Sequence, residues 1–245
     1  MNLLGRENEI LRILTKLSNS GVKFILVGGY AVSAHSKHRF SIDCDLIVEA
    51  KDVPTLKTLL LKEDFSKGVE NDSFDETYGG KFIRYNKKVG KLPVSVDLLV
   101  DALACRQTGG SWSYGYVLSN SVDAKVSGIT SSVESKIPKR ELLMAFKLHA
   151  ARKPDVRDVV MLGEEADWSE VFPYLNRGDP EKLQISLKQF VQSLDDTKLI
   201  DSLKGEFKLQ GNVTPSLQKA KRQVQKILDQ LSETVKDIRN VRKVD

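Results

Sequence analysis

The stretch that decides the fold is Phe24–Val48, FILVGGYAVSAHSKHRFSIDCDLIV. It opens with a short apolar run that ends at Gly28-Gly29, continues through a helix-compatible segment, and closes with a second apolar run. This order predicts a strand, a tight turn, a helix and a second strand.

Two carboxylates enter the second of these strands. Because side chains alternate between the faces of a strand, we expect Asp43 and Asp45 on one face and Cys44 on the other. Neighbouring carboxylates repel each other unless a cation lies between them, and magnesium prefers oxygen ligands. An Asp-x-Asp pair is also common on a solvated strand, so the pair alone leaves both interpretations open.

The glycine pair also has two interpretations. It can be a simple turn, or it can let the backbone approach a phosphate bound by the N–H groups of the following helix. Since the carboxylates follow closely, the combination favours a phosphate cradle at Gly28, Gly29 and Tyr30, next to half of a metal site.

A third acid, Asp97, interrupts the apolar segment 94–100. A buried Asp is costly unless it is paired or binds a metal; the alternative places Asp97 at a strand end in water. If residues 82–85 form a hairpin with this segment, its strand can lie beside the strand of Asp43 and Asp45. Three carboxylates there can hold two divalent ions about 3.5–4 Å apart, as in-line phosphoryl transfer requires.

The helix predicted from Pro138 onward carries Lys147 within an apolar run. This lysine can extend along the surface to water, or it can bind an anion such as a triphosphate; the proposed acids and cradle favour the anion. His149 is expected to face away from Lys147 in a structural role.

The other segments carry weaker signals. We expect a loop over 64–80, short strands near Val117 and over 124–126, and a long amphipathic helix over 216–244. An aromatic cluster can either anchor the core or stack on a base; it comprises Trp112, Tyr114 and Tyr116.

The composition is that of a soluble globular protein, with 245 residues, 40% hydrophobic and 29% charged. No apolar stretch is long enough to span a bilayer, charges interrupt the N-terminus too early for a signal peptide, and two cysteines are too few for a disulfide framework. We therefore expect a cytoplasmic protein with no membrane partner. The net charge of +5 is concentrated in the C-terminal third, which suits either a nucleic-acid partner or an ordinary solvated helical surface.

The N-terminal motifs together resemble the nucleotidyltransferase superfamily typified by DNA polymerase beta. Its pattern is an apolar strand, Gly-Gly or Gly-Ser, a helix, and Asp-x-Asp. The form Arg39-x-Ser41-x-Asp43-x-Asp45 is most similar to the branch of AbiEii/AbiGii-type toxins of toxin–antitoxin systems. One departure is Gly29, which stands where many superfamily members have a serine that contacts phosphate.

Further along the chain, the resemblance continues in the segment after Pro138. The toxin-like branch has a lysine in an apolar helix, then a basic residue, then a basic–acidic pair. Here these positions correspond to Lys147, Arg152 and Arg157-Asp158. The resemblance implies that the arginines contact phosphates and that Asp158 orients Lys147 or takes a proton.

The resemblance implies an α/β (α+β) fold, with a nucleotidyltransferase-type mixed sheet flanked by helices over 1–135 and a helical domain over 136–245. It implies metal-dependent transfer of an NMP from an NTP to an acceptor hydroxyl. Two Mg²⁺ ions would bind Asp43 and Asp45, and Asp97 would hold one of them and help activate the hydroxyl.

The acceptor implied is RNA, a tRNA 3′ end, and the partner an antitoxin protein. Two alternatives stay open. One is a small-molecule nucleotidyltransferase of the antibiotic-modifying type, and the other is a non-catalytic nucleotide- or RNA-binding protein on the same fold.

Overall fold

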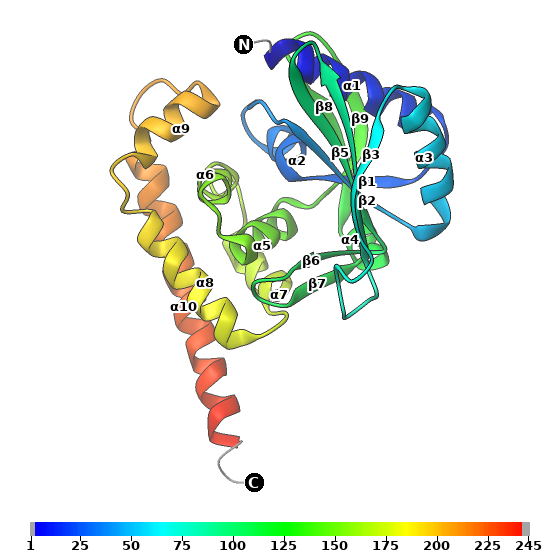
Figure 1. Cartoon of the computed structure of the whole chain (residues 1–245). Coiled ribbons are helices and arrows are strands. Elements are labelled where there is room, and N and C mark those ends of the chain that lie inside the picture. Colours follow the sequence, from blue (N-terminus) through cyan, green and yellow to red (C-terminus); the bar gives the residue numbers. More distant parts are fainter. Residues whose placement is uncertain (1–2, 242–245) are drawn as a thin grey trace. The chain divides into compact units, whose positions relative to one another are not determined.

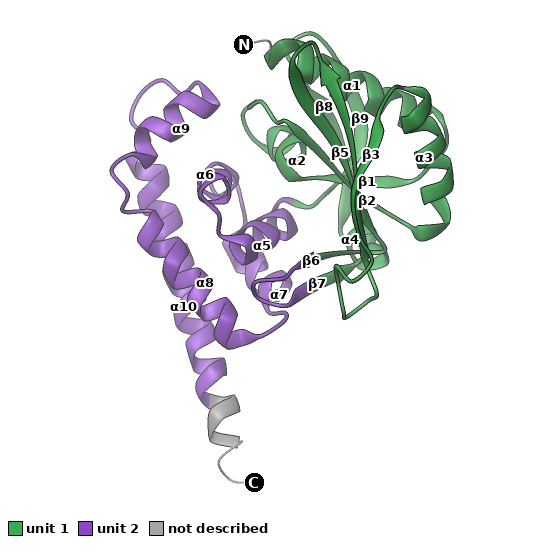
Figure 2. Cartoon of the chain, viewed as in Figure 1, with its two compact units in different colours: residues 1–104, 111–139 green, residues 105–110, 140–245 purple. Residues whose placement is uncertain are grey.

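The computed structural model of the protein describes residues 3–241 and divides the chain into two compact units (Figure 2). Unit 1 runs to Ala104 and continues with Ser111–Lys139; unit 2 comprises Cys105–Gly110 and the chain from Arg140 onward. The predicted boundary after residue 135 falls inside a strand, Ser132–Pro138, and the structure places the division after that strand.

A five-stranded mixed sheet forms the centre of unit 1 (Figure 1). Its strands lie in the order β1-β2-β5-β4-β3; only β2 and β5 are parallel, and the other neighbours are antiparallel. The predicted fold class, a mixed α/β sheet flanked by helices, is confirmed. The strands are β1 (Phe24–Val27), β2 (Asp43–Val48), β3 (Ser66–Asn71), β4 (Lys81–Val89) and β5 (Leu92–Val100).

Helices cover both faces of this sheet. Figure 1 shows α2 on the opposite side of the sheet from α3, and α2 packs against β1 and β2. The helices are α1 (Leu3–Asn19), α2 (Gly28–His35), the 3-10 turn η1 (Ala50–Asp52), α3 (Val53–Lys62) and α4 (Tyr114–Ser119). Two small two-stranded sheets complete the strands: β6 (Ala102–Cys105) with β7 (Gly110–Ser113), and β8 (Ser121–Ser127) with β9 (Ser132–Pro138).

Three local expectations were wrong. Part of the expected loop 64–80 is the strand β3, whose polar residues pair with β4 at the sheet edge. The segment around Val117 is the helix α4, which Ser113 caps by accepting from the N–H of Tyr116. Pro138 ends β9, and the helix after it begins at Arg140.

In the aromatic cluster, Trp112 and Tyr114 are buried, 0% and 7% exposed, so the core role is confirmed for these two residues. The segment that carries them therefore anchors unit 1.

Unit 2 is helical from Arg140 onward. The predicted C-terminal helix is α10, which packs against α8 and α6; its last predicted residues, 242–244, lie outside the described residues. None of the helices within residues 3–241 is long and apolar enough to cross a membrane. The elements are α5 (Arg140–Ala150), α6 (Lys153–Leu162), the 3-10 turn η2 (Trp168–Glu170), α7 (Val171–Leu175), α8 (Pro180–Ser193), α9 (Leu199–Phe207) and α10 (Thr214–Val241).

His149 has a structural role in unit 2, where its ring forms hydrogen bonds to two other segments. Its Nε2 donates to the carbonyl oxygen of Leu175 at 2.8 Å, so Nδ1 accepts from the Thr108 hydroxyl at 2.6 Å. The ring thereby ties the 105–110 segment to α5 and α7. Burial lowers the pKa of His149 to about 4, so the ring is neutral at pH 7.

Candidate active site

The site in unit 1 begins at the turn from β1 into α2, where glycine is required for two reasons. Gly28 has φ +67°, a left-handed conformation that side chains disfavour. A Cβ at this position would lie 2.0 Å from Oδ2 of Asp45, whose backbone pairs with that of Val27. The absence of a side chain at Gly28 therefore lets the Asp45 carboxylate lie directly against the start of α2.

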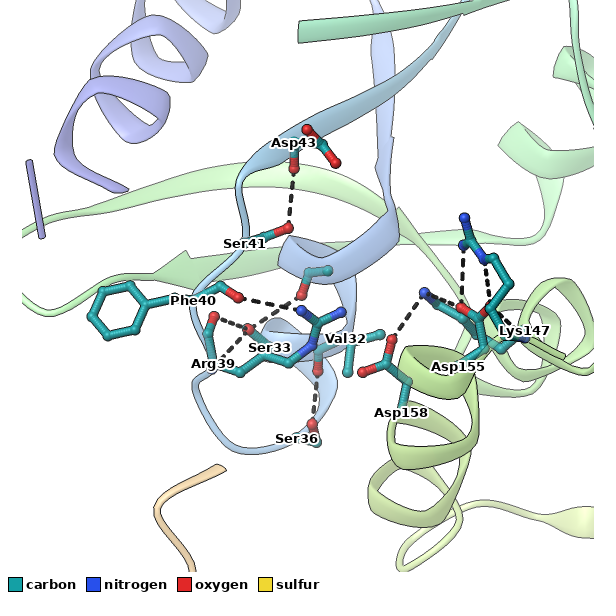
Figure 3. Close-up of polar contacts among 12 residues, drawn as sticks. Val32, Ser33, Ser36, Arg39, Phe40, Ser41, Asp43, Lys147, Asp155 and Asp158 are labelled. Atoms are coloured by element: carbon teal, nitrogen blue, oxygen red, sulfur yellow. Dashed lines mark hydrogen bonds and ion pairs between the residues drawn. The ribbon is translucent and has the colours of Figure 1, made fainter. Parts of the chain in front are cut away.

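The next glycine accommodates the loop between α2 and β2. A Cβ at Gly29 would lie 2.6 Å from Oγ of Ser41 and 2.9 Å from Nη2 of Arg39. Figure 3 shows the Ser41 hydroxyl donating to the backbone oxygen of Asp43, at 3.2 Å. Tyr30 is 3% exposed and its hydroxyl donates to the Ser41 carbonyl, so the side chain holds the loop and only its backbone can serve a ligand.

The three acids lie on one face of β2 and β5. In the parallel register Asp43 pairs with Ser95, and Asp45 pairs with Asp97, so the paired side chains point the same way. Asp43 and Asp45 are half-buried, whereas Asp97 is only 2% exposed. Cys44 points to the other face and is fully buried, which raises the pKa of its thiol.

Asp97 is bound by an arginine that the sequence analysis missed. Nε of Arg84 donates to Oδ1 of Asp97 at 2.8 Å, and Nη2 donates to Oδ2 at 2.5 Å. Burial raises the pKa of the Asp97 carboxyl above its ordinary value even though Arg84 opposes this effect. The sequence contains the information that places Arg84. The β4–β5 hairpin turns at Gly90, and counting the paired residues outward from this turn puts Arg84 opposite Asp97.

This arrangement fits one divalent cation better than the predicted two. Asp43 and Asp45 present carboxylate oxygens on one partly open face, and hard oxygens suit Mg²⁺. Both oxygens of Asp97 accept from Arg84, and within the described part of the chain no group of three or more Asp, Glu, His or Cys side chains is placed to hold a metal ion. The predicted role of Asp97 as a metal ligand does not fit.

A second polar cluster lies within unit 2 and is centred on Lys147 of α5. Its Nζ lies 2.9 Å from Oδ1 of Asp155 and 2.9 Å from Oδ2 of Asp158, both on α6 (Figure 3). Arg152 donates through Nε to Oδ2 of Asp155 at 2.7 Å. Two cations and two carboxylates leave the four side chains with no net charge. This pairing does not support the predicted contact of Lys147 with a triphosphate.

The other two predicted residues of this unit, Arg157 and Asp158, have different partners. Asp158 forms an ion pair with Lys147, whereas Arg157 points to α9 and donates to Ser202 Oγ at 2.8 Å. Asp155, which the sequence analysis did not single out, is 0% exposed. Burial alone would raise the pKa of Asp155, but Lys147 and Arg152 outweigh burial and hold the pKa below its ordinary value.

No protein-family model matches the sequence, and no curated protein sequence matches it. Among solved structures, a candidate nucleotidyltransferase from H. pylori is 18% identical, with a TM-score of 0.46 over 94% of this chain and 96% of that chain. JHP933 from Helicobacter pylori is 17% identical, with a TM-score of 0.46 over 98% and 97%. The antibiotic-resistance factor ANT(2'')-Ia is 16% identical, with a TM-score of 0.39 over 82% and 90%. These values describe a distant likeness of fold.

Proposed function

We propose that this protein is a nucleotidyltransferase that moves an NMP from an NTP to an acceptor hydroxyl with the help of a divalent cation. The observation that carries the proposal is the contact at the β1–α2 turn. There, only the lack of a side chain at Gly28 lets the Asp45 carboxylate lie against the first turn of α2. A cation ligand and a helix N-terminus in contact suit a metal-bound phosphate group.

Each part of the site has a role in this reaction. The backbone N–H groups at Gly29 and Tyr30 bind phosphate oxygens, and Asp43 and Asp45 hold the cation. The cation, when bound, neutralises phosphate charge in the transition state. The acceptor oxygen forms a bond to the α-phosphorus as the bond to pyrophosphate breaks, and the hydroxyl proton passes to water, because both oxygens of Asp97 are occupied by Arg84.

The acceptor we propose is RNA. On α10, one exposed face carries basic and amide side chains around a shallow hollow of about 430 Å³, whose walls are the aliphatic parts of these side chains. A surface of this kind favours a polyanion such as an RNA backbone over a cationic small molecule. From the resemblance we further propose a tRNA 3′ end as the acceptor and growth inhibition that an antitoxin protein relieves. The lining residues are Gln218, Lys221, Arg222, Gln225 and Lys226.

The test is a transfer assay with purified protein, Mg²⁺, total RNA and each of four NTPs labelled at the α-phosphate. The inactive variant is Asp43→Ala/Asp45→Ala. A matched control, Asp123→Ala/Glu134→Ala, removes two carboxylates from the exposed β8–β9 pair of the same unit. We expect label in tRNA with the wild type and the control, and none with the inactive variant.

Other results would change the proposal in distinct ways. Label in a small molecule or in the protein itself would retain the transferase and reject the RNA acceptor. Equal labelling by the wild type and the Asp43→Ala/Asp45→Ala variant would reject the site.

A further inference from the structure

Asp97 and Arg84 form a closed pair on the face of the sheet that carries Asp43 and Asp45. The two residues are partners in the antiparallel register of β4 and β5, so their side chains emerge side by side. The guanidinium donates to both carboxylate oxygens, at 2.8 and 2.5 Å, which is the two-pronged geometry that arginine forms with carboxylates.

Neighbouring groups hold the pair in place. The guanidinium carbon of Arg84 lies 5.7 Å from the centroid of the Phe82 ring, within the range of a cation–π contact. The Ser95 hydroxyl, which donates to Asp43 at 2.8 Å, is also near enough to lower the pKa of Asp97. The Phe82 ring therefore holds the guanidinium, and Ser95 helps to hold the carboxylate.

A second cation has no room at Asp97. The side chain of Asp97 is 3% exposed, whereas Mg²⁺ retains several water molecules and binds oxygens at about 2.0–2.1 Å. An ion at that distance from either oxygen would also meet the positive charge of Arg84 at close range. Asp43 and Asp45, in contrast, are partly open.

We infer that this site binds one divalent cation, at Asp43 and Asp45. The guanidinium of Arg84, which is bound to Asp97, takes the place of a second ion. The inference rests on the proposed function, because the divalent cation and the Arg84 guanidinium would together neutralise the phosphates of the NTP. The Arg84 side chain is 39% exposed and uses only Nε and Nη2 for Asp97. The N–H groups of Nη1 remain for a phosphate oxygen of the NTP. Arg84 is thus a positioning residue for the triphosphate.

The test counts Mn²⁺ ions by titration of the full chain, with free Mn²⁺ measured by electron paramagnetic resonance. We expect one Mn²⁺ per chain for the wild type, an unchanged count for Asp97→Asn, and none for Asp43→Asn/Asp45→Asn. Arg84→Gln uncovers Asp97, so a second Mn²⁺ should bind, and the added Asp97→Asn change should remove it. Arg84→Lys keeps the positive charge and should bind one ion.

Thermal unfolding of each variant establishes that it is folded before its ions are counted. Two ions in the wild type, one of them lost in Asp97→Asn, would overturn the inference and leave the proposed function intact. A count of one in Arg84→Gln would also overturn it, because Arg84 would then exclude nothing. No Mn²⁺ bound to the wild type would reject both the inference and the cation-dependent function.

Discussion

Replacing Gly28 with alanine tests the contact between the β1–α2 turn and the Asp45 carboxylate. The left-handed backbone at Gly28, with φ +67°, costs a residue with a side chain about 1–2 kcal/mol. The new methyl group would also lie 2.0 Å from Oδ2 of Asp45, and ordinary contact begins at 3.4 Å. Asp45 must therefore retreat by about 1.4 Å, whereas metal ligands tolerate only about ±0.2 Å.

Gly21→Ala is the matched control for this change. Gly21 has φ +78° and nothing within 4 Å of a Cβ, so it carries the backbone cost without the clash. We expect Gly21→Ala to lower the free energy of unfolding by about 1–2 kcal/mol and to leave Mn²⁺ affinity unchanged. Gly28→Ala should lose more stability and weaken Mn²⁺ binding more than about tenfold, since one of two ligands is displaced.

The measurements are thermal or denaturant unfolding and the Mn²⁺ titration, applied to both variants. If Gly28→Ala matches Gly21→Ala in unfolding and binds Mn²⁺ like the wild type, the reasoning about Asp45 is refuted.

Two further predictions concern unit 2. Lys147→Met should lower the free energy of unfolding by about 3–5 kcal/mol in denaturant titrations, because it leaves two buried carboxylates without their shared cation. Lys221→Met, which breaks an exposed ion pair with Asp195, should cost at most about 1 kcal/mol; equal losses would contradict this reasoning. His149 should make stability fall by about 3 kcal/mol between pH 6.5 and 4, since the unfolded chain takes up a proton there and the folded chain, with a His149 pKa of about 4, does not. The dependence should be absent in His149→Gln, and its persistence in that variant would assign it to another group.

The sequence was informative wherever the structure follows from local pattern. The order of β1, α2 and β2 follows from alternating apolar runs and the glycine turn, and Cys44 faces the core because a strand alternates its side chains. The adjacency of Asp45 and Asp97 required only a hairpin and a parallel pairing.

The features that the sequence analysis missed depend on contacts between segments that are distant in the sequence. β3 is polar and fully or half exposed along its length, so it has no hydrophobic signal, and its pairing with β4 defines it. Arg84 is an ordinary charged strand residue by type, and only the register counted outward from the turn at Gly90 shows that it lies opposite Asp97. Asp155 is hidden in the same way, because its burial between Lys147 and Arg152 depends on how α5 packs against α6.

The most direct test of the proposed reaction compares an NTP labelled at the α-phosphate with the same NTP labelled at the γ-phosphate, in the presence of Mg²⁺ and RNA. We predict that the α-label enters the acceptor while the γ-label is released as pyrophosphate, and that Asp43→Ala/Asp45→Ala abolishes both. Transfer of the γ-label to the acceptor, or no magnesium-dependent turnover of any NTP, would contradict nucleotidyl transfer at this site.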